Sequence, residues 1–305
     1  MSPTPPPALK GLVGLMLGVL LTLGTGLILT PLLQHYAFSM VLVMAVGLYG
    51  ATLLGVAQGK ALIGLLLTIG LTLIPAAGLV SYGLAVDLIL ALITGIVIAV
   101  ICQWLVYPFF PESSPLAAEA AEAAVISDPQ QSRWIALRTV LIVLPPVMAA
   151  FTNPALYLAT IVKTTLLAQQ GSRLSAKAAG YELIGSTFLA GCFAILLWFG
   201  LKLWPSLWMF FLWMLLLGVY IAAKLYGVVA SKYEPSYWQN VIVTVVILLG
   251  PAVEDSANGK DVYQAFAVRF MLFIAVTLYA WLAIWVLEYC RSRLHARRLS
   301  RAGEG

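Results

Sequence analysis

Long apolar runs separated by short polar intervals occupy almost the whole chain. Between Leu88 and Ile101, only Thr94 and Gly95 interrupt the hydrophobic sequence. About 20 residues of α-helix cross the hydrocarbon core of a bilayer, and the runs have about this length. They predict ten membrane-spanning helices, at residues 11–34, 36–57, 61–80, 84–108, 134–152, 154–169, 181–203, 206–227, 236–253 and 263–288.

The longest polar interval, residues 111–133, predicts a division of the chain into two parts. Its Ser-Ser-Pro followed by LAAEAAEAAV is typical of a capped surface helix. We therefore expect a first transmembrane half of four helices over residues 1–110 and a cytoplasmic linker helix over 111–133. A second half of six helices then covers residues 134–290, and a basic cytoplasmic tail covers 291–305.

Composition supports an all-α polytopic membrane protein with about ten transmembrane helices. Hydrophobic residues make up 62% of the sequence and charged residues 10%, whereas soluble domains carry about 25% charged residues. The net charge of +5 favours an anionic membrane surface over nucleic acid, because the cations lie between apolar runs and in the tail. The three cysteines are widely separated and have no metal-ligand spacing, so we expect neither a metal nor another cofactor.

The positions of lysine and arginine predict the orientation, because cytoplasmic loops retain positive charge. Alternate connections and the tail carry most of the cations, whereas Lys202 and Lys260 lie on the opposite side. The larger set consists of Lys10, Lys60, Arg133, Arg173, Lys177, Lys224, Lys232, Arg291, Arg293, Arg297, Arg298 and Arg301. Both termini are therefore predicted to be cytoplasmic.

A shift of 174 positions aligns the first four apolar runs with the last four. The aligned identities are Gly11 with Gly185, Pro31 with Pro205, and Asp87 with Asp261. This predicts two halves of the same orientation, arranged as four plus six helices. The runs at 134–152 and 154–169 have no counterpart, as though a six-plus-six protein lacked its first two spans.

Three segments carry a resemblance to known membrane proteins: DLILALITGIVIAVICQWLVYPFFP, RTVLIVLPPVMAAFTNPALYLATIVKTTLLAQQG and DVYQAFAVRFMLFIAVTLYAWLAIWVLE. With them the chain resembles the fusaric acid resistance-like and aromatic acid exporter families of bacterial inner-membrane proteins, in particular an uncharacterised branch without a large soluble domain. The resemblance implies efflux of small organic or aromatic acids or amphipathic drugs, often with a periplasmic membrane-fusion partner. The unmatched helix pair and the absence of a large cytoplasmic domain depart from the longer exporters.

Three cations inside predicted spans, Lys163, Arg138 and Arg269, are candidates for a transport pathway, because an ionisable group in a bilayer is costly and is often functional. Lys163 lies roughly 9 Å from the inner end of its run, at about 1.5 Å per residue, among Thr160, Thr164 and Thr165. Arg138 lies one turn inside its run, and snorkelling of its head group to the cytoplasmic surface explains that position better than a pathway role.

The segment GPAVEDSANGKDVYQA predicts an acidic hairpin at the periplasmic side. One interpretation is a solvated hairpin that turns at Gly259. In the other, Asp261 or Glu254 pairs with Arg269 or exchanges protons, while Arg269 and Lys163 attract an organic anion.

The start of the ninth run carries Tyr237 and Trp238, followed by Gln239 and Asn240. These groups could receive a substrate, but anchoring at the membrane interface is the more economical interpretation.

The motifs of common enzymes are absent from this sequence: it has two histidines, no GxSxG, no HExxH and no phosphate loop. We therefore expect a non-enzymatic protein. The sequence favours a proton-coupled exporter of a small organic anion, and the alternative is a non-transporting membrane subunit that anchors or assembles a periplasmic partner. The spacing of Gly14 and Gly18 permits close helix packing, either within one chain or in a homo-oligomer.

Overall fold

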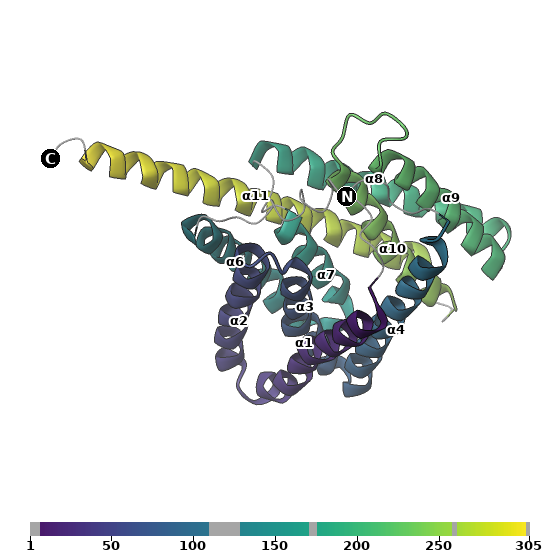
Figure 1. Ribbon diagram of the computed structural model, residues 1–305, viewed down its shortest axis with the longest axis horizontal. Helices are drawn as coiled ribbons and strands as arrows, with labels where there is room; N and C mark the ends of the chain where they lie inside the picture. Colours follow the sequence, from purple (N-terminus) through teal and green to yellow (C-terminus); the bar gives the residue numbers. More distant parts are fainter. Residues whose placement is uncertain (1–6, 110–128, 171–175, 258–260, 303–305) are drawn as a thin grey trace. The chain divides into compact units, whose positions relative to one another are not determined.

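The computed structural model describes residues 7–109, 129–170, 176–257 and 261–302. Its described part is helical and contains ten helices (Figure 1). They are α1 (Leu9–His35), α2 (Ala37–Ala57), α3 (Ala61–Val80), α4 (Tyr82–Val106), α6 (Pro129–Thr152), α7 (Pro154–Gln170), α8 (Ala176–Leu203), α9 (Leu207–Leu225), α10 (Pro235–Ala257) and α11 (Val262–Ala302). The predicted linker helix at 111–133 lies mostly outside the described residues.

Nine of the described helices are long and apolar enough to cross a membrane, which confirms a polytopic membrane protein. The tenth, α7, has 17 residues and is slightly shorter than the others. The last helix is much longer than predicted, because α11 continues from its apolar part through the basic segment as far as Ala302.

Polar residues between the runs fix where several helices begin. The Ser81 hydroxyl accepts a hydrogen bond from the backbone N–H of Leu84 at 3.0 Å, and Ser206 does the same for Met209 at 3.2 Å. Both serines therefore act as N-caps for α4 and α9. These caps separate neighbouring helices that hydrophobicity alone would have left continuous.

The chain forms two compact units, Met1–Thr165 and Leu166–Gly305, which are described separately below. Unit 1 contains α1 to α4, α6 and most of α7. In it α6 packs against α2 and α3. The units thus divide at a different point from the two halves that the polar interval 111–133 predicts, because α6 buries its apolar side on the first four helices.

In unit 1, α1 and α3 run parallel in close backbone contact. A methyl group added to Gly70 of α3 would overlap the carbonyl oxygen of Thr22, and one added to Gly78 would lie 2.6 Å from a side-chain carbon of Thr30. The contacting residue numbers rise together in the two helices, from Thr22 to Thr30 in α1 and from Gly70 to Gly78 in α3, so the helices are parallel. The neighbouring α2 is antiparallel to α3, since Gly64 meets Ala51 whereas Leu71 meets Gly47.

The helix α4 completes this group in the opposite direction to α1. The Trp104 indole N–H, near the end of α4, donates to the carbonyl of Pro7, just before α1, at 2.9 Å. Between these ends lies a core made of Val19, Leu23, Leu66, Ile74, Ala77, Ala85 and Ile89. Leu158 of α7 packs against the same core.

Unit 2 repeats this arrangement with α8 to α11. Ser236 and Asn240 of α10 meet Glu182 and Ser186 of α8 in the same order, so α8 and α10 are parallel. The other two helices are antiparallel to α8. For α9 the contacts are Phe193 with Tyr220 and Gly200 with Trp213, and for α11 they are Thr187 with Thr277 and Gly191 with Phe270.

The two units share their helix pairings. In unit 1 the pairs are α1 with α2, α3 and α4, and α3 with α2 and α4; in unit 2 they are α8 with α9, α10 and α11, and α10 with α9 and α11. The predicted alignment of the first four runs with the last four is therefore matched by the packing and by the helix directions. Two groups of four helices therefore share one internal arrangement, and α6 and most of α7 are added to the first of them.

Candidate functional site

The Lys163 side chain is completely buried in the middle of α7. The neighbouring Thr160, Thr164 and Thr165 are buried with it. Thr160 and Thr164 donate their hydroxyl hydrogens to the helix backbone, at Tyr157 and Thr160 respectively. Their oxygen lone pairs therefore stay available to a cation or to a hydrogen-bond donor. The Thr165 hydroxyl has no hydrogen-bond partner among the described residues.

Arg138 is also buried, with 5% of its surface exposed, beside the buried Thr139 of α6. This position differs from the predicted snorkelling, in which the guanidinium would lie at an exposed surface. The apolar stem of an arginine reaches the surface only when its helix faces outward. Here α6 turns this side toward the interior of unit 1, so Arg138 and Lys163 are both interior cations of that unit.

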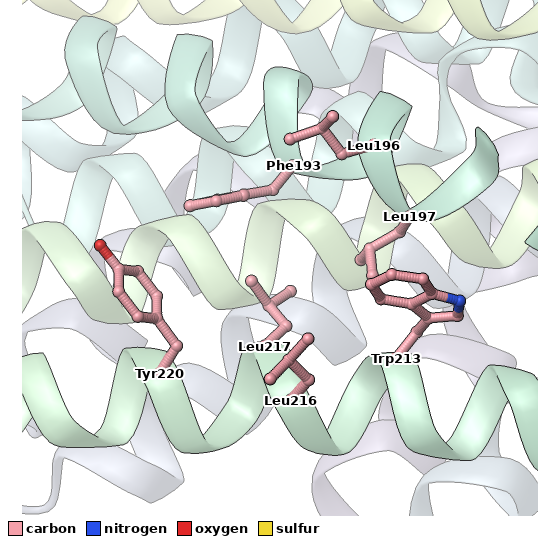
Figure 2. A pocket seen from close by; sticks show the side chains of 7 residues that line it. All are labelled: Phe193, Leu196, Leu197, Trp213, Leu216, Leu217 and Tyr220. Atoms are coloured by element: carbon pink, nitrogen blue, oxygen red, sulfur yellow. The ribbon is translucent and has the colours of Figure 1, made fainter. Parts of the chain in front are cut away.

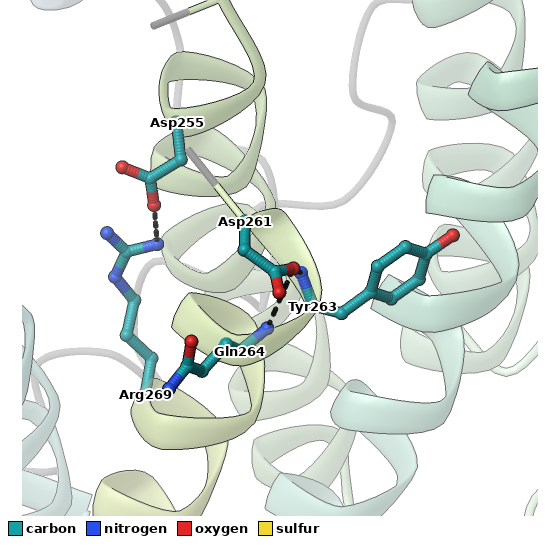
Figure 3. A network of polar contacts seen from close by, with 5 residues as sticks. All are labelled: Asp255, Asp261, Tyr263, Gln264 and Arg269. Carbon is teal, nitrogen blue, oxygen red and sulfur yellow. Dashed lines mark hydrogen bonds and ion pairs between the residues drawn. The ribbon is translucent and has the colours of Figure 1, made fainter. Parts of the chain in front are cut away.

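Arg269 of α11 forms an ion pair with Asp255 of α10 (Figure 3). The distance from Nη1 to Oδ2 is 2.6 Å, and the two side chains are 23% and 7% exposed. Sequence analysis predicted that Asp261 or Glu254 pairs with Arg269, and the structure instead pairs it with Asp255. The side chain of Glu254 lies outside the described residues.

Asp261 has a different role, at the start of α11 (Figure 3). Its Oδ1 accepts hydrogen bonds from the backbone N–H groups of Tyr263 at 3.0 Å and Gln264 at 3.4 Å. The first N–H groups of a helix have no partner within the helix, and a carboxylate just before them satisfies them. Asp261 is therefore a capping residue, exposed at the surface of unit 2.

At the same end of unit 2, Lys202 joins the end of α8 to the start of α11. Its ammonium donates to the Tyr263 hydroxyl at 2.7 Å and lies 4.8 Å from the centre of the tyrosine ring. Together with Asp255 and Arg269, this contact ties three helices together at the predicted periplasmic side.

The other end of unit 2 carries polar pairs between α8 and α10. The Ser236 hydroxyl donates to the Glu182 carboxylate at 3.0 Å. One turn further in, the Asn240 amide donates to the Ser186 hydroxyl, which itself donates to the backbone carbonyl of Glu182. We call these two contacts the α8–α10 polar pairs.

The polar contacts continue toward α11. The hydroxyl oxygens of Thr187 and Thr277 lie 3.4 Å apart, and each threonine donates to a carbonyl of its own helix. All these side chains except Glu182 and Ser236 are buried. Hydroxyl and amide groups across a helix interface stabilise membrane bundles modestly, which gives these contacts a packing role at least.

The aromatic side chains at this end form a connected cluster. Tyr233 and Tyr237 stack at 4.2 Å, and Trp238 makes edge contacts with both and with Tyr220 of α9. Tyr237 and Trp238 are each 5% exposed. They therefore pack inside unit 2. The anchoring interpretation predicted instead that they would be exposed at the membrane interface.

An apolar groove of about 340 Å³ lies between α8 and α9 (Figure 2). Its lining consists of Phe193, Leu196, Leu197, Trp213, Leu216, Leu217 and Tyr220. Phe193 and Tyr220 join the groove to the aromatic cluster through an edge-to-face contact at 6.1 Å.

Several of these features escaped sequence analysis, although spacing could have revealed some of them. Glu182 and Ser186 are four residues apart, as are Ser236 and Asn240, so each pair occupies one face of an otherwise apolar helix. Asp255 was not distinguished from its acidic neighbours. The groove depends on the shapes of packed side chains and has no signal in the sequence.

A family model described as a protein of unknown function (DUF2955) matches residues 1–106, which end where α4 ends. No curated protein and no solved structure matches the chain. The matched segment is the group of four helices whose packing recurs in α8 to α11, so the match and the repeat delimit the same structural block.

Proposed function

We propose that this multi-pass membrane protein is a transporter that exports small organic or aromatic acids, or amphipathic drugs, in exchange for protons. In this proposal it resides in the bacterial inner membrane with both termini in the cytoplasm and catalyses no chemical reaction. A periplasmic membrane-fusion protein is the proposed partner at the outer side.

The buried Lys163 carries the proposal. A cation in the interior of a membrane protein costs several kcal/mol unless it is paired or hydrated, so such residues usually mark ion or substrate pathways. Lys163 lies among threonine oxygens that have lone pairs to spare. An organic anion that reached this place would gain a charge-assisted contact with the ammonium.

The other predicted residues support the proposal less strongly. Arg269 already has a carboxylate partner at 2.6 Å, so it could bind a substrate anion only after leaving Asp255. Asp261 holds the first turn of α11 and is occupied with that contact. Lys163 and Arg138 are the first candidates for an anion site because they are cations buried in the interior of unit 1.

The repeated packing of α1 to α4 and α8 to α11 also supports a transporter. Alternating access in many transporters moves one repeat against another around a site between them. Two groups of four helices with the same pairings and directions provide such elements. The helices α6 and α7, which have no counterpart, contribute the interior cations.

The test is export by the purified full chain in liposomes with an imposed pH gradient and labelled benzoate as the probe. We expect Lys163→Ala to lower kcat/KM at least about tenfold, which corresponds to the loss of about 1.4 kcal/mol of anion binding. Lys60→Ala is the matched control, because Lys60 is exposed in the connection between α2 and α3. It should transport like the unmodified protein.

Two outcomes would contradict the proposal. Equal transport by Lys163→Ala and Lys60→Ala would remove the site from the pathway. No transport by the unmodified chain, combined with loss of a fusion protein from membranes after deletion of this chain, would favour the alternative of an anchoring subunit.

A further inference from the structure

The groove between α8 and α9 has an aromatic contact near each end. At one end the Trp213 ring lies against Gly200, where a methyl group would come within 2.6 Å of the indole. At the other end Phe193 and Tyr220 meet edge to face (Figure 2). Leucines line the middle from both helices. The groove is open on its outer side, and its volume of about 340 Å³ lies at the lower end of the range of small-ligand sites.

Polar groups occur at one end of this groove. The hydroxyl of Tyr220 lies at the groove margin, and Lys224 follows one turn later on α9. Trp213, Leu217, Tyr220 and Lys224 follow one another at spacings of four, three and four residues, so they share one face of the helix. The face of α9 that lines the groove therefore continues to the cationic Lys224.

Lys224 retains hydrogen-bonding capacity. Its ammonium donates to the carbonyl of Ala230 at 2.9 Å, and this bond uses one of its three hydrogens. Lys224 is half-buried, and it is the single charged residue of α9. Lys224 itself does not line the groove but follows the lining residue Tyr220 by one turn, and a cation at that place is complementary to a molecule with a hydrophobic tail and one negative charge.

We propose that the groove binds a single-tailed amphipathic carboxylate. The hydrocarbon or aryl tail lies between Phe193, Leu217 and Trp213, and the carboxylate contacts Lys224 and the Tyr220 hydroxyl. This binding site is separate from Lys163, and it does not depend on the export proposed above.

Binding is measured with the full chain in non-ionic detergent, from the quenching of tryptophan fluorescence by a terminally brominated undecanoate. We expect saturable quenching that is largely lost in Trp213→Phe, because Trp213 is the tryptophan that lines the groove and its fluorescence is the one a bound probe would quench. Lys224→Gln should raise the Kd for the carboxylate about tenfold or more. The methyl ester of the same probe should bind weakly to both proteins.

A matched pair of variants tests the position of the tail. Leu216→Phe adds bulk inside the groove, whereas Leu215→Phe adds the same bulk on the neighbouring residue, which does not line it. Both leucines are at least half exposed, so both variants should fold, as thermal unfolding will verify. Only Leu216→Phe should weaken binding of the carboxylate.

The proposal is overturned if the acid and its ester bind alike, if Lys224→Gln has no effect, or if the two phenylalanine variants behave alike. Tighter quenching by a brominated phosphatidylglycerol than by the carboxylate would identify a lipid site and would also overturn it. A chain that binds the carboxylate as expected but exports no benzoate would contradict the proposed function and leave this inference intact.

Discussion

The charge of Arg269, on a largely apolar helix, is paired with Asp255, which lies 2.6 Å away on the neighbouring helix. Breaking such a pair by removing one member is costly, because the remaining charge stays partly buried. Replacing both members is much less costly, since neither charge then needs a partner. The two residues should therefore behave as a coupled unit.

We expect Asp255→Asn to lower the free energy of unfolding by about 1–3 kcal/mol. The double variant Asp255→Asn/Arg269→Gln should recover most of this loss. Thermal unfolding in detergent measures both, and Asp261→Asn is a useful comparison, because an asparagine still caps a helix. Additive effects of the two single substitutions would show that the pair contributes no coupling.

The choice of Asp255 shows what sequence analysis misses at the level of single residues. The acidic segment and Arg269 were identified as neighbours, but consecutive residues on a helix point about 100° apart. The partner therefore depends on how far α10 continues, and it continues as far as Ala257. Asp261 was assigned a functional role because its place just before the run at 263–288 was not interpreted as a helix-capping position.

At the scale of whole helices, the closest approach of α1 to α3 occurs at glycine positions, because glycine has no side chain to separate the backbones. Gly26 and Gly70 face each other across this contact. Small residues at such points let membrane helices gain van der Waals contact along their backbones. The glycine pair Gly14 and Gly18, which the sequence suggested as a packing motif, lies elsewhere on α1 and has open space around it.

Gly70→Ala should destabilise the protein by about 1–3 kcal/mol, because the added methyl group overlaps the Thr22 carbonyl and forces the helices apart. Gly18→Ala is the matched control on α1. It adds the same methyl group in open space, and it should be neutral or stabilising by up to about 1 kcal/mol, as expected from helix propensity. Denaturation in detergent compares them, and equal effects would contradict the close packing of α1 and α3.

Helix positions were largely predictable because the runs are apolar and capped by polar residues. The run predicted at 61–80 coincides with α3, and others differ by a few residues. The end of α11 was not predictable from hydrophobicity, because a basic helix that leaves the apolar region gives no hydropathy signal. The placement of α6 in unit 1 also depends on tertiary packing.

At the scale of the whole molecule, the helix directions indicate which ends of the helices lie on the same side of the membrane. Within unit 1, Lys60 and Tyr82 lie at opposite ends of α3, and both are exposed. Because α3 is long and apolar enough to cross a membrane, we expect them on opposite sides, and the distribution of lysine and arginine predicts which side is which.

A membrane-impermeant maleimide tests this orientation on intact cells, in a chain whose Cys102, Cys192 and Cys290 are replaced by serine. We expect it to label Tyr82→Cys from outside and to leave Lys60→Cys unlabelled. Permeabilised cells should show labelling of both positions. The reverse pattern on intact cells would place both termini outside.

The repeat itself was visible in the sequence through three identities, and its meaning became clear only in the pairings of the helices. The α1–α3 contact and the α8–α10 contact occupy the same place in their units but use different forces. Backbone atoms meet at Gly70, so a displacement of α1 along α3 drives a neighbouring side chain into that glycine.

The α8–α10 polar pairs instead repeat along their helices. Glu182 and Ser186 are one turn apart, and so are Ser236 and Asn240. A slide of one helix by a single turn, about 5.4 Å, brings Ser186 opposite Ser236, so one polar pair replaces the two present now. Of two duplicated interfaces, one therefore rests on close backbone contact, and the other has a second register that keeps part of its polar contact.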